Sequence, residues 1–307
     1  MYLDYYKELL NINEIPTFLK KYLKCHSLLR LKKVGYFCGM DYASDEIYNF
    51  REYISRFDHS LTVALLVYKL TNDKLATLRG LFHDIGTPVF SHVIDYMNHD
   101  YEMQETTEEY TEKVIYSDKY LLECFSKDNI NPHDIINFKE SSVVDNERPK
   151  LCADRLDGVI LTGIGWTKNI TKRDISKIIN SITLYTNDEN EMEIGFVDEL
   201  VARKVIEISN SIDVMCHSFE DNYMMNLLAT ITKKLIDNNY ITYEDLFIKD
   251  EDYVFNILDN ISDLEIKELY IKFKNISLDD IEIVSLPNIK KRKLYPLVNG
   301  RRIKDEK

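Results

Sequence analysis

The stretch 60–70, SLTVALLVYKL, is apolar on almost every side and limits, more than any other feature, how this chain can fold. A helix without a polar face has to be covered all round by other elements. Residues 74–84 and 151–161 show the same kind of pattern, with apolar side chains at helical spacing. Only 9 Gly and 6 Pro interrupt the 307 residues, which favours long helices over a turn-rich β fold. The sequence therefore predicts an all-α, mainly helical bundle built around buried central helices.

The other segments fit this bundle, with one exception. Apolar residues recur at helical spacing through 1–35, and long helices are predicted over 197–215 and 221–237. The exception is 181–196, SITLYTNDENEMEIGF, which alternates on either side of a polar turn at 187–190. Such alternation around a turn is typical of a small β-hairpin.

Short motifs predict where several of the helices begin. Asn131-Pro132 combines a capping side chain with a proline at the first helical position. Thr106-x-x-Glu109 and Ser262-x-x-Glu265 each have the pattern of a capping box. Pro88 suits the first turn of a helix that we expect to continue over 90–98.

No linker rich in Gly, Ser or Pro divides the chain, so we predict one packed unit. A helical domain is expected over 1–180, and the hairpin, C-terminal helices and a basic tail are expected to pack on it over 181–307. The tail itself, 288–307, holds eight Lys or Arg and two acidic residues. Two interpretations of it stay open: a solvated terminus, or an arm that folds back over a phosphate site, which the apolar residues in KLYPLVNGRR favour.

Composition excludes some classes of partner and compartment. The formal net charge is −13, which makes binding of duplex nucleic acid by the body of the protein unfavourable. No apolar run approaches the roughly 20 residues that span a bilayer, and the acidic N-terminus MYLDYYKELL does not resemble a targeting segment. The five Cys are scattered and odd in number, which indicates reduced thiols and a cytoplasmic protein.

Four of the seven His fall between positions 59 and 99, and three of them lie in or beside strongly apolar helices. His59 is placed at the start of one predicted buried helix, the adjacent pair His83-Asp84 ends another, and Asp154 lies in a third. Burying imidazole and carboxylate is unfavourable unless the groups are paired or bind a metal. Two imidazoles and two carboxylates from three helices form a ligand set that suits a divalent metal.

The segments RFDHS (56–60), GLFHDIGTPVFSH (80–92) and ADRLD (153–157) resemble the HD-domain metal-dependent phosphohydrolases, in particular the deoxynucleoside triphosphate triphosphohydrolase branch. This resemblance implies that His59, His83, Asp84 and Asp154 ligate one metal. Iron, manganese, magnesium, nickel and zinc are not distinguished by this set, and a second metal stays an open alternative. It also implies an HD-domain helical bundle, and relatives in this branch often assemble into homo-oligomers.

The resemblance assigns further roles in the substrate pocket. Arg56 is similar to an arginine that contacts substrate phosphate. His92 and Asp95 are similar to a catalytic His and an acid beside the phosphate, and His99 would share their helical face, although YMNHDY is also typical of an exposed helix end. For Arg155 a contact with phosphate and a surface salt bridge are equally good interpretations.

The chain departs from the family pattern at several positions. Thr87 and Thr107 replace two His of active triphosphohydrolases, one of them a proposed proton donor. Gly158 and Thr162 replace the tyrosine and the acid that help to seat the deoxyribose. Glu105, Glu108 and His99 are the alternative sources of acid–base chemistry. The metal set thus looks complete, while the sugar pocket and the general acid do not match.

These departures lead to two hypotheses about function. The first is a metal-dependent phosphohydrolase acting on a small nucleotide or related phosphoester, with a pocket unlike that of the triphosphohydrolases. The second is a nucleotide-binding sensor that keeps the metal and hydrolyses little or nothing. A nuclease is disfavoured by the acidic body.

Overall fold

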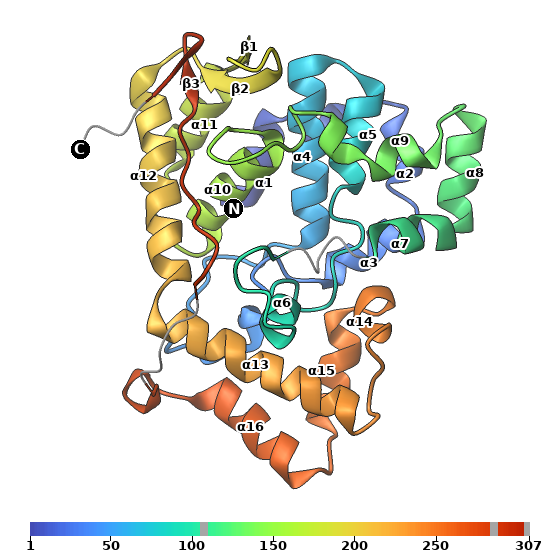
Figure 1. Cartoon of the computed structure of the whole chain (residues 1–307), viewed down its shortest axis with the longest axis vertical. Coiled ribbons are helices and arrows are strands. Elements are labelled where there is room, and N and C mark those ends of the chain that lie inside the picture. Colours follow the sequence, from blue (N-terminus) through green and yellow to red (C-terminus); the bar gives the residue numbers. More distant parts are fainter. Residues whose placement is uncertain (105–109, 283–287, 304–307) are drawn as a thin grey trace.

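The computed structural model describes residues 1–104, 110–282 and 288–303 (Figure 1). In these residues it has sixteen α-helices and one small four-stranded sheet, so the prediction of a mainly helical fold is confirmed. Short 3₁₀ turns lie at Ile12–Glu14, Leu31–Lys33, Met40–Tyr42, Phe138–Glu140 and Leu278–Asp280. None of the helices described is both long and apolar enough to cross a membrane.

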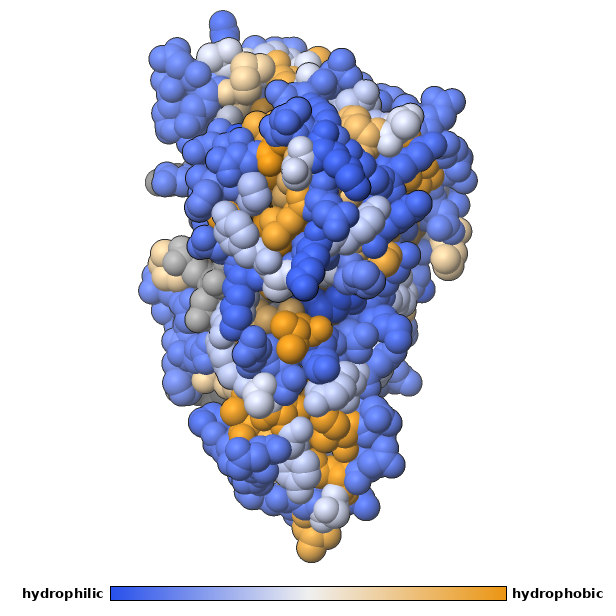
Figure 2. Space-filling view, turned by 90° about the vertical axis from the view of Figure 1, so that its right-hand side faces the viewer, coloured by the Kyte–Doolittle hydropathy of each residue, from blue (hydrophilic) through white to orange (hydrophobic). Residues whose placement is uncertain are grey.

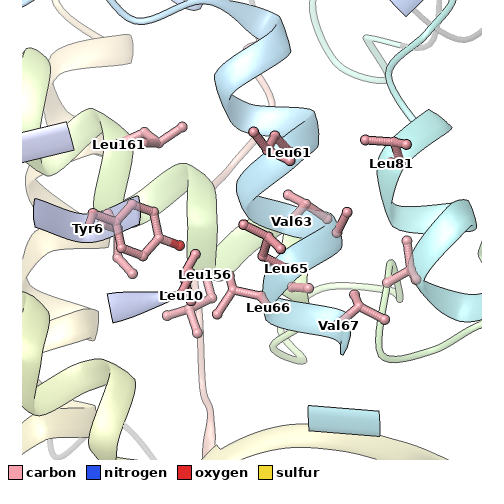
Figure 3. Close-up of a cluster of buried hydrophobic side chains, with 14 of the residues drawn as sticks. Tyr6, Leu10, Leu61, Val63, Leu65, Leu66, Val67, Leu81, Leu156 and Leu161 are labelled. Atoms are coloured by element: carbon pink, nitrogen blue, oxygen red, sulfur yellow. The ribbon is translucent and has the colours of Figure 1, made fainter. Parts of the chain in front are cut away.

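Helix α4 (Arg56–Thr71) is the central helix, as its apolar sequence predicts. Ser55 and Asp58 form a capping box at its N-terminus, in which the side chain of each accepts a hydrogen bond from the backbone N–H of the other. Helices α1 (Tyr2–Leu9), α5 (Lys74–Phe82) and α10 (Ala153–Gly165) surround it. Figure 3 shows their apolar side chains meeting in one cluster. The three helices that carry the predicted metal ligands thus share one core.

Five short helices pack beside α5, on the right in Figure 1. They are α2 (Leu19–Tyr22), α3 (His26–Arg30), α7 (Thr111–Ser117), α8 (Lys119–Lys127) and α9 (Pro132–Ile136). The predicted start of α9 is confirmed, because the Asn131 side chain accepts a hydrogen bond from the N–H of His133 and Pro132 occupies the first helical position.

The predicted hairpin is present, and it belongs to a larger sheet. After α11 (Lys172–Ser181), strands β1 (Ile182–Thr186) and β2 (Met192–Phe196) pair antiparallel. The C-terminal arm, residues 288–303, adds β3 (Leu297–Val298) parallel to β2 and β4 (Arg301–Arg302) antiparallel to β3. From the sheet the arm runs beside the long helix α12 (Glu199–Cys216), where it is drawn in dark red in Figure 1. Of the two interpretations of the tail, the packed arm is the one that the structure has.

A second group of helices forms the lower part of the molecule in Figure 1. It comprises α6 (Val93–Met97), α13 (Phe219–Asp237), α14 (Asp245–Ile248), α15 (Glu251–Asp259) and α16 (Leu264–Asn275). Their apolar side chains form a second hydrophobic cluster, to which Met40, Tyr48 and Phe90 also belong. Figure 2 shows a mainly hydrophilic face, with hydrophobic side chains gathered at this lower end.

Two predicted helix starts are wrong, and one falls outside the described residues. Helix α6 begins at Val93, because Phe90 and Ser91 have positive φ angles of 65° and 46° and form a turn instead. The cap of α16 is Asp263, one residue after the predicted serine, and its side chain accepts from the N–H of Ile266. The predicted capping box at 106–109 lies outside the described residues.

The boundary predicted between residues 180 and 181 stays a prediction. The first hydrophobic cluster extends from α1 to Phe196 and α12, and the second joins residues before 100 to those after 220. Both clusters therefore contain segments from either side of that boundary.

Candidate metal centre and substrate pocket

Three of the four predicted metal ligands converge at one point. His59 lies in the first turn of α4, His83 directly follows α5, and Asp154 lies in the first turn of α10. The Nε2 atoms of the two His are 3.2 Å apart, and Asp154 Oδ1 is 3.1 Å from that of His59 and 3.5 Å from that of His83. Both imidazoles are almost fully buried. These three side chains can hold a metal ion.

The hydrogen bonds of the two rings fix which nitrogen faces the site. His59 Nδ1 is 2.7 Å from Asp157 Oδ2, and His83 Nδ1 is 2.8 Å from the carbonyl oxygen of Gly80. An ionised carboxylate and a carbonyl only accept, so both Nδ1 atoms donate, and each ring in its neutral form presents an Nε2 lone pair to the site. Two such lone pairs at 3.2 Å repel each other unless they share a proton or bind the same metal ion.

The charges around His59 point the same way. Burial disfavours a protonated ring, but hydrogen bonds to Asp154 and Asp157 outweigh it and raise the pKa of His59 to about 10. The negative potential that favours a proton here also favours a divalent metal ion, which competes with the proton for the same nitrogen. The residues present therefore fit the metal that the sequence predicts.

Asp84, the fourth predicted ligand, lies beside this point. Its carboxylate oxygens are 3.7 and 3.8 Å from the Nε2 atoms of His59 and His83. One of them, Oδ2, also accepts a hydrogen bond of 2.8 Å from Arg56 Nη1. Arg56 is buried, and its guanidinium also donates to Ser91 Oγ and packs on the ring of Tyr36.

A second group of side chains that could bind a metal lies next to the first. One ligand atom each of Asp145, Cys152 and Asp154 lies within 4.8 Å of the others. However, Arg155 Nη2 donates to Asp145 Oδ1 at 2.8 Å, and burial raises the pKa of the Cys152 thiol to about 12. A neutral thiol and a carboxylate that is already paired make this group a poor metal site.

A cavity of about 920 Å³ opens above the metal centre. One part of its wall is aromatic, with the rings of Tyr36, Tyr48, Phe50 and Trp166. In this part Tyr48 donates a hydrogen bond of 2.6 Å to Asp221, and burial raises the pKa of Asp221 to about 7. The lining also includes cationic side chains, those of Lys139, Arg148, Lys150, Lys290 and Arg292.

His92 lines the cavity and is bonded to the other predicted catalytic residue. His92 Nδ1 is 2.8 Å from Oδ2 of the fully buried Asp95. The carboxylate accepts, so His92 presents an unprotonated Nε2 as its second nitrogen. Burial lowers the pKa of His92, which favours this neutral form. His99 does not join the pair, because it lies beyond the end of α6, exposed, and contacts the hydroxyl of Tyr101.

Arg155 forms an ion pair with Asp145, and its contact with phosphate stays a prediction. It is buried, not on the surface, and its guanidinium is held by Asp145, by Asn146 and by the carbonyl of Lys150. It also lines the cavity, and these three contacts use three of the five N–H groups of its guanidinium.

Two of the four positions that depart from the family pattern line the cavity. Thr87 is fully buried, and its hydroxyl has no hydrogen-bond partner among the described residues. Thr162 and Gly158 line the cavity. A Cβ atom at position 158 would lie 2.9 Å from the hydroxyl oxygen of Tyr36, so the Tyr36 side chain fills the space next to this glycine. Thr107, Glu105 and Glu108 lie outside the described residues.

Sequence reasoning missed several residues of this site. Asp157 orients His59, and the signal available was a second Asp three residues after Asp154 in an apolar helix. No local signal distinguishes Arg148 or Tyr36 from other loop residues. Arg292 stands out in the sequence only as one of the basic residues of the tail.

Comparison with known proteins agrees with this geometry. Residues 56–134 match the model of the HD domain family. The chain is also 25% identical, over 149 residues, to the uncharacterized protein YdhJ of Bacillus subtilis (strain 168). That similarity covers 47% of this chain and 43% of the relative, so it spans less than half of the relative's length. The matched segment contains the paired His83-Asp84 and His59, so it supports a relationship of this part of the chain to the HD domain, a domain of metal-dependent phosphohydrolases.

Proposed function

We propose that this protein is a metal-dependent phosphohydrolase that acts on a nucleotide or a related phosphoester. The observation that carries the proposal is the convergence of two imidazole nitrogens and the Asp154 carboxylate at a cavity that both aromatic rings and cationic side chains line. A nucleotide has the matching parts, since a base packs on aromatic rings and phosphates bind cations.

Different side chains would supply different parts of the hydrolysis reaction. A bound divalent metal would supply an activated water near neutral pH and a Lewis acid for a phosphoryl oxygen. Arg56 holds Asp84 in place and lies where charge would build on the phosphate, which it can stabilise. His92, oriented by Asp95, presents a nitrogen that can accept a proton from water.

The pocket favours a substrate other than a deoxynucleoside triphosphate whose deoxyribose binds as it does in the family. Tyr36 reaches the space beside Gly158, and Thr162 brings no charge. A deoxyribose held by a tyrosine and an acid at these two positions would find neither group here. The sugar, or its counterpart, is therefore expected to bind differently.

The second candidate, a nucleotide sensor, is favoured by one observation. Three residues near the expected position of the proton donor are poorly suited to that role. Thr87 is sealed in the core, His99 lies away on the surface, and the lowered pKa of His92 makes this residue a weak acid donor. A site of this kind can keep its metal and ligand yet turn over slowly.

The deciding experiment measures metal content and hydrolysis together. Purified wild type, His83→Ala and Asp84→Ala would be analysed for bound metal and screened with a panel of nucleotides and Mn²⁺. His99→Ala is the matched control, since its imidazole is exposed. We expect metal and phosphatase activity to be lost in the first two variants only.

Two other outcomes would contradict parts of the proposal. Full metal occupancy in both His83→Ala and Asp84→Ala would exclude the metal centre. Tight nucleotide binding by the metal-loaded wild type, without product from any nucleotide, would replace the hydrolase by the sensor.

A further inference from the structure

The C-terminal arm is built into the wall of the cavity. Its strand β3 pairs with β2, and the N–H of Tyr295 donates to the carbonyl of Pro149 at 2.9 Å. Ile289 and Leu294 are buried, with 4% and 1% of their surface exposed. The arm is therefore fixed both to the sheet and to the loop that carries Arg148.

These contacts place Arg292 at the cavity. Its backbone N–H donates to Asp213 Oδ1 at 2.7 Å, and its carbonyl accepts from Ser209 Oγ at 3.0 Å, so helix α12 holds its backbone from one side. Its guanidinium donates to the neutral amide of Gln104, and its buried Nε atom has no partner among the described residues. No carboxylate in the described part of the chain forms an ion pair with Arg292.

Arg148 faces the same space from the loop before α10. It lines the cavity, and its guanidinium forms no hydrogen bond or ion pair with any residue described. Burial lowers the pKa of Arg148 to about 10, and the charges of Arg292 and Arg155 add to this effect. Two guanidinium groups thus lie within electrostatic reach of each other without carboxylate partners.

The other cations of the pocket have contacts of their own, and the Lys139 ammonium lies over the ring of Phe138. Arg56 pairs with Asp84, Arg155 pairs with Asp145, and Lys150 pairs with Glu189 and Glu191. Lys290 donates to the carbonyl of Met103. The acids that remain at the cavity are Asp154 at the metal centre, Glu147, whose side chain is exposed, and Asp221, which Tyr48 binds. Among the arginines that line the cavity, Arg148 and Arg292 are therefore the two without a carboxylate partner in the described part of the chain.

We propose that Arg148 and Arg292 form a second anion subsite, separate from the metal centre, which binds a further phosphate of the ligand. A guanidinium binds phosphate in a bidentate manner, and two of them without carboxylate partners suit a group that carries more than one negative charge. This inference rests on the proposed function and narrows it: the ligand carries two or more linked phosphates. One is held at the metal centre and another between the arm and the Arg148 loop.

The test measures binding of inorganic triphosphate and of inorganic phosphate to the metal-free full-length protein by calorimetry. Without metal, the contribution of the arginine subsite is measured by itself. We expect triphosphate to bind more tightly than phosphate. Arg148→Ala and Arg292→Ala are each expected to weaken triphosphate binding about tenfold or more, which corresponds to one charge-assisted hydrogen bond.

Matched controls lie on the same arm. Lys291 and Lys293 flank Arg292, carry the same charge and are exposed outside the cavity wall. Lys291→Ala and Lys293→Ala should leave the affinity for triphosphate close to that of the wild type. Arg292→Lys, which keeps the charge without the bidentate geometry, should lie between Arg292→Ala and the wild type. Thermal melting of every variant identifies any that fails to fold, and Arg148→Gln and Arg292→Gln provide replacements.

The results that would overturn this inference differ from those that would overturn the proposed function. Unchanged triphosphate affinity in folded variants of both arginines would overturn the subsite, as would equal losses in the two lysine variants. Binding that depends on Arg148 and Arg292, in a protein that hydrolyses no nucleotide, would keep the subsite and remove the hydrolase.

Discussion

Asp157 does not line the cavity, yet it decides how His59 presents its metal-binding nitrogen. It is fully buried, and it accepts one hydrogen bond from His59 Nδ1 and another, of 2.6 Å, from the hydroxyl of Tyr6. A carboxylate at this position fixes the tautomer of the ring and makes the opposite nitrogen more basic. The metal centre thus depends on a residue of α10 that lies outside the cavity, and through its bond with Tyr6 on α1.

We predict that Asp157→Asn weakens metal binding about 10- to 100-fold while the protein stays folded. An amide can donate to Nδ1, which would put the ring proton on Nε2 and remove the lone pair that faces Asp154. Competition with a coloured chelator measures the affinity. Tyr6→Phe is the control: it keeps the carboxylate and should change the affinity much less. Equal affinities in wild type and Asp157→Asn would contradict this role.

A second prediction concerns Gly158 and Tyr36. In Gly158→Ala the new methyl group would lie 2.9 Å from the Tyr36 hydroxyl, and such overpacking costs about 1–3 kcal/mol. Tyr36→Phe removes the hydroxyl. In that background the same Gly→Ala change should be neutral or stabilising by about 1 kcal/mol, because alanine is the better residue inside a helix. Urea unfolding of the four proteins gives the interaction free energy, and strictly additive effects would exclude the contact.

The site shows how far the sequence alone can reach at this scale. His59, His83 and Asp154 are found because burying His and Asp side chains among apolar residues is unfavourable unless they are paired or bind a metal. Arg148 and Arg292 cannot be found in this way. They stand out because they have no carboxylate partner, and only the folded structure shows which side chains are paired. Gly158 marks a departure from the family, but nothing local shows that Tyr36, more than a hundred residues earlier, fills the space.

At the scale of helices and strands, a wide apolar face was the sequence feature that predicted helices reliably. Helices α4, α5, α10, α12 and α13 follow from spacing alone, and the hairpin follows from its alternation. The start of α6 was wrong because tertiary contacts shape it: the Phe90 ring packs on Phe255 in the second cluster, and Ser91 accepts from Arg56. Strands β3 and β4, of two residues each, are too short to produce a pattern.

The arm is attached at its far end by one ion pair. Both terminal nitrogens of Arg302 donate to the two carboxylate oxygens of Glu193, at 2.9 and 2.8 Å, and Glu193 is fully buried in β2. Glu193 also accepts from the N–H of Leu151 and from Asn187. The arm, the hairpin and the start of α10 therefore meet at this carboxylate.

We predict that Arg302→Ala destabilises the protein by about 3 kcal/mol, because it leaves a buried carboxylate without its cation. The loss should be smaller in the double variant Arg302→Ala with Glu193→Gln, in which no charge remains to be buried. Urea unfolding measures both, and hydrogen exchange should show faster exchange over 294–303 in the single variant. A double variant as unstable as the single one would show that the pair does not anchor the arm.

For the whole molecule, the cavity lies where the two hydrophobic clusters meet. Phe37, Val159 and Leu294 of the first cluster line it, as do Met40 and Met225 of the second. The single tryptophan, Trp166, packs against both clusters and also lines the cavity. A ligand bound here contacts both clusters and should stabilise them together.

We therefore predict that Mn²⁺ raises the melting temperature of the wild type and not that of His83→Ala. A ligand at 100 times its Kd stabilises the folded state by about 2.7 kcal/mol. The shift should be the same by far-UV circular dichroism, which reports on all helices, and by the emission maximum of Trp166, which reports on the junction. Two separate transitions that respond differently to Mn²⁺ would show that the clusters unfold independently.

The attachment of the arm also bears on how such a pocket can diversify. Pairing of β3 with β2 and the Arg302 ion pair fix the arm, and neither depends on the side chains at 290–293. Substitutions there can change the charge of the wall without disturbing α4, α5 or α10, which carry the metal ligands. We expect relatives with the same ligands to vary on this short stretch, so that preference for a different ligand can evolve by changing a few residues while the reaction centre stays as it is.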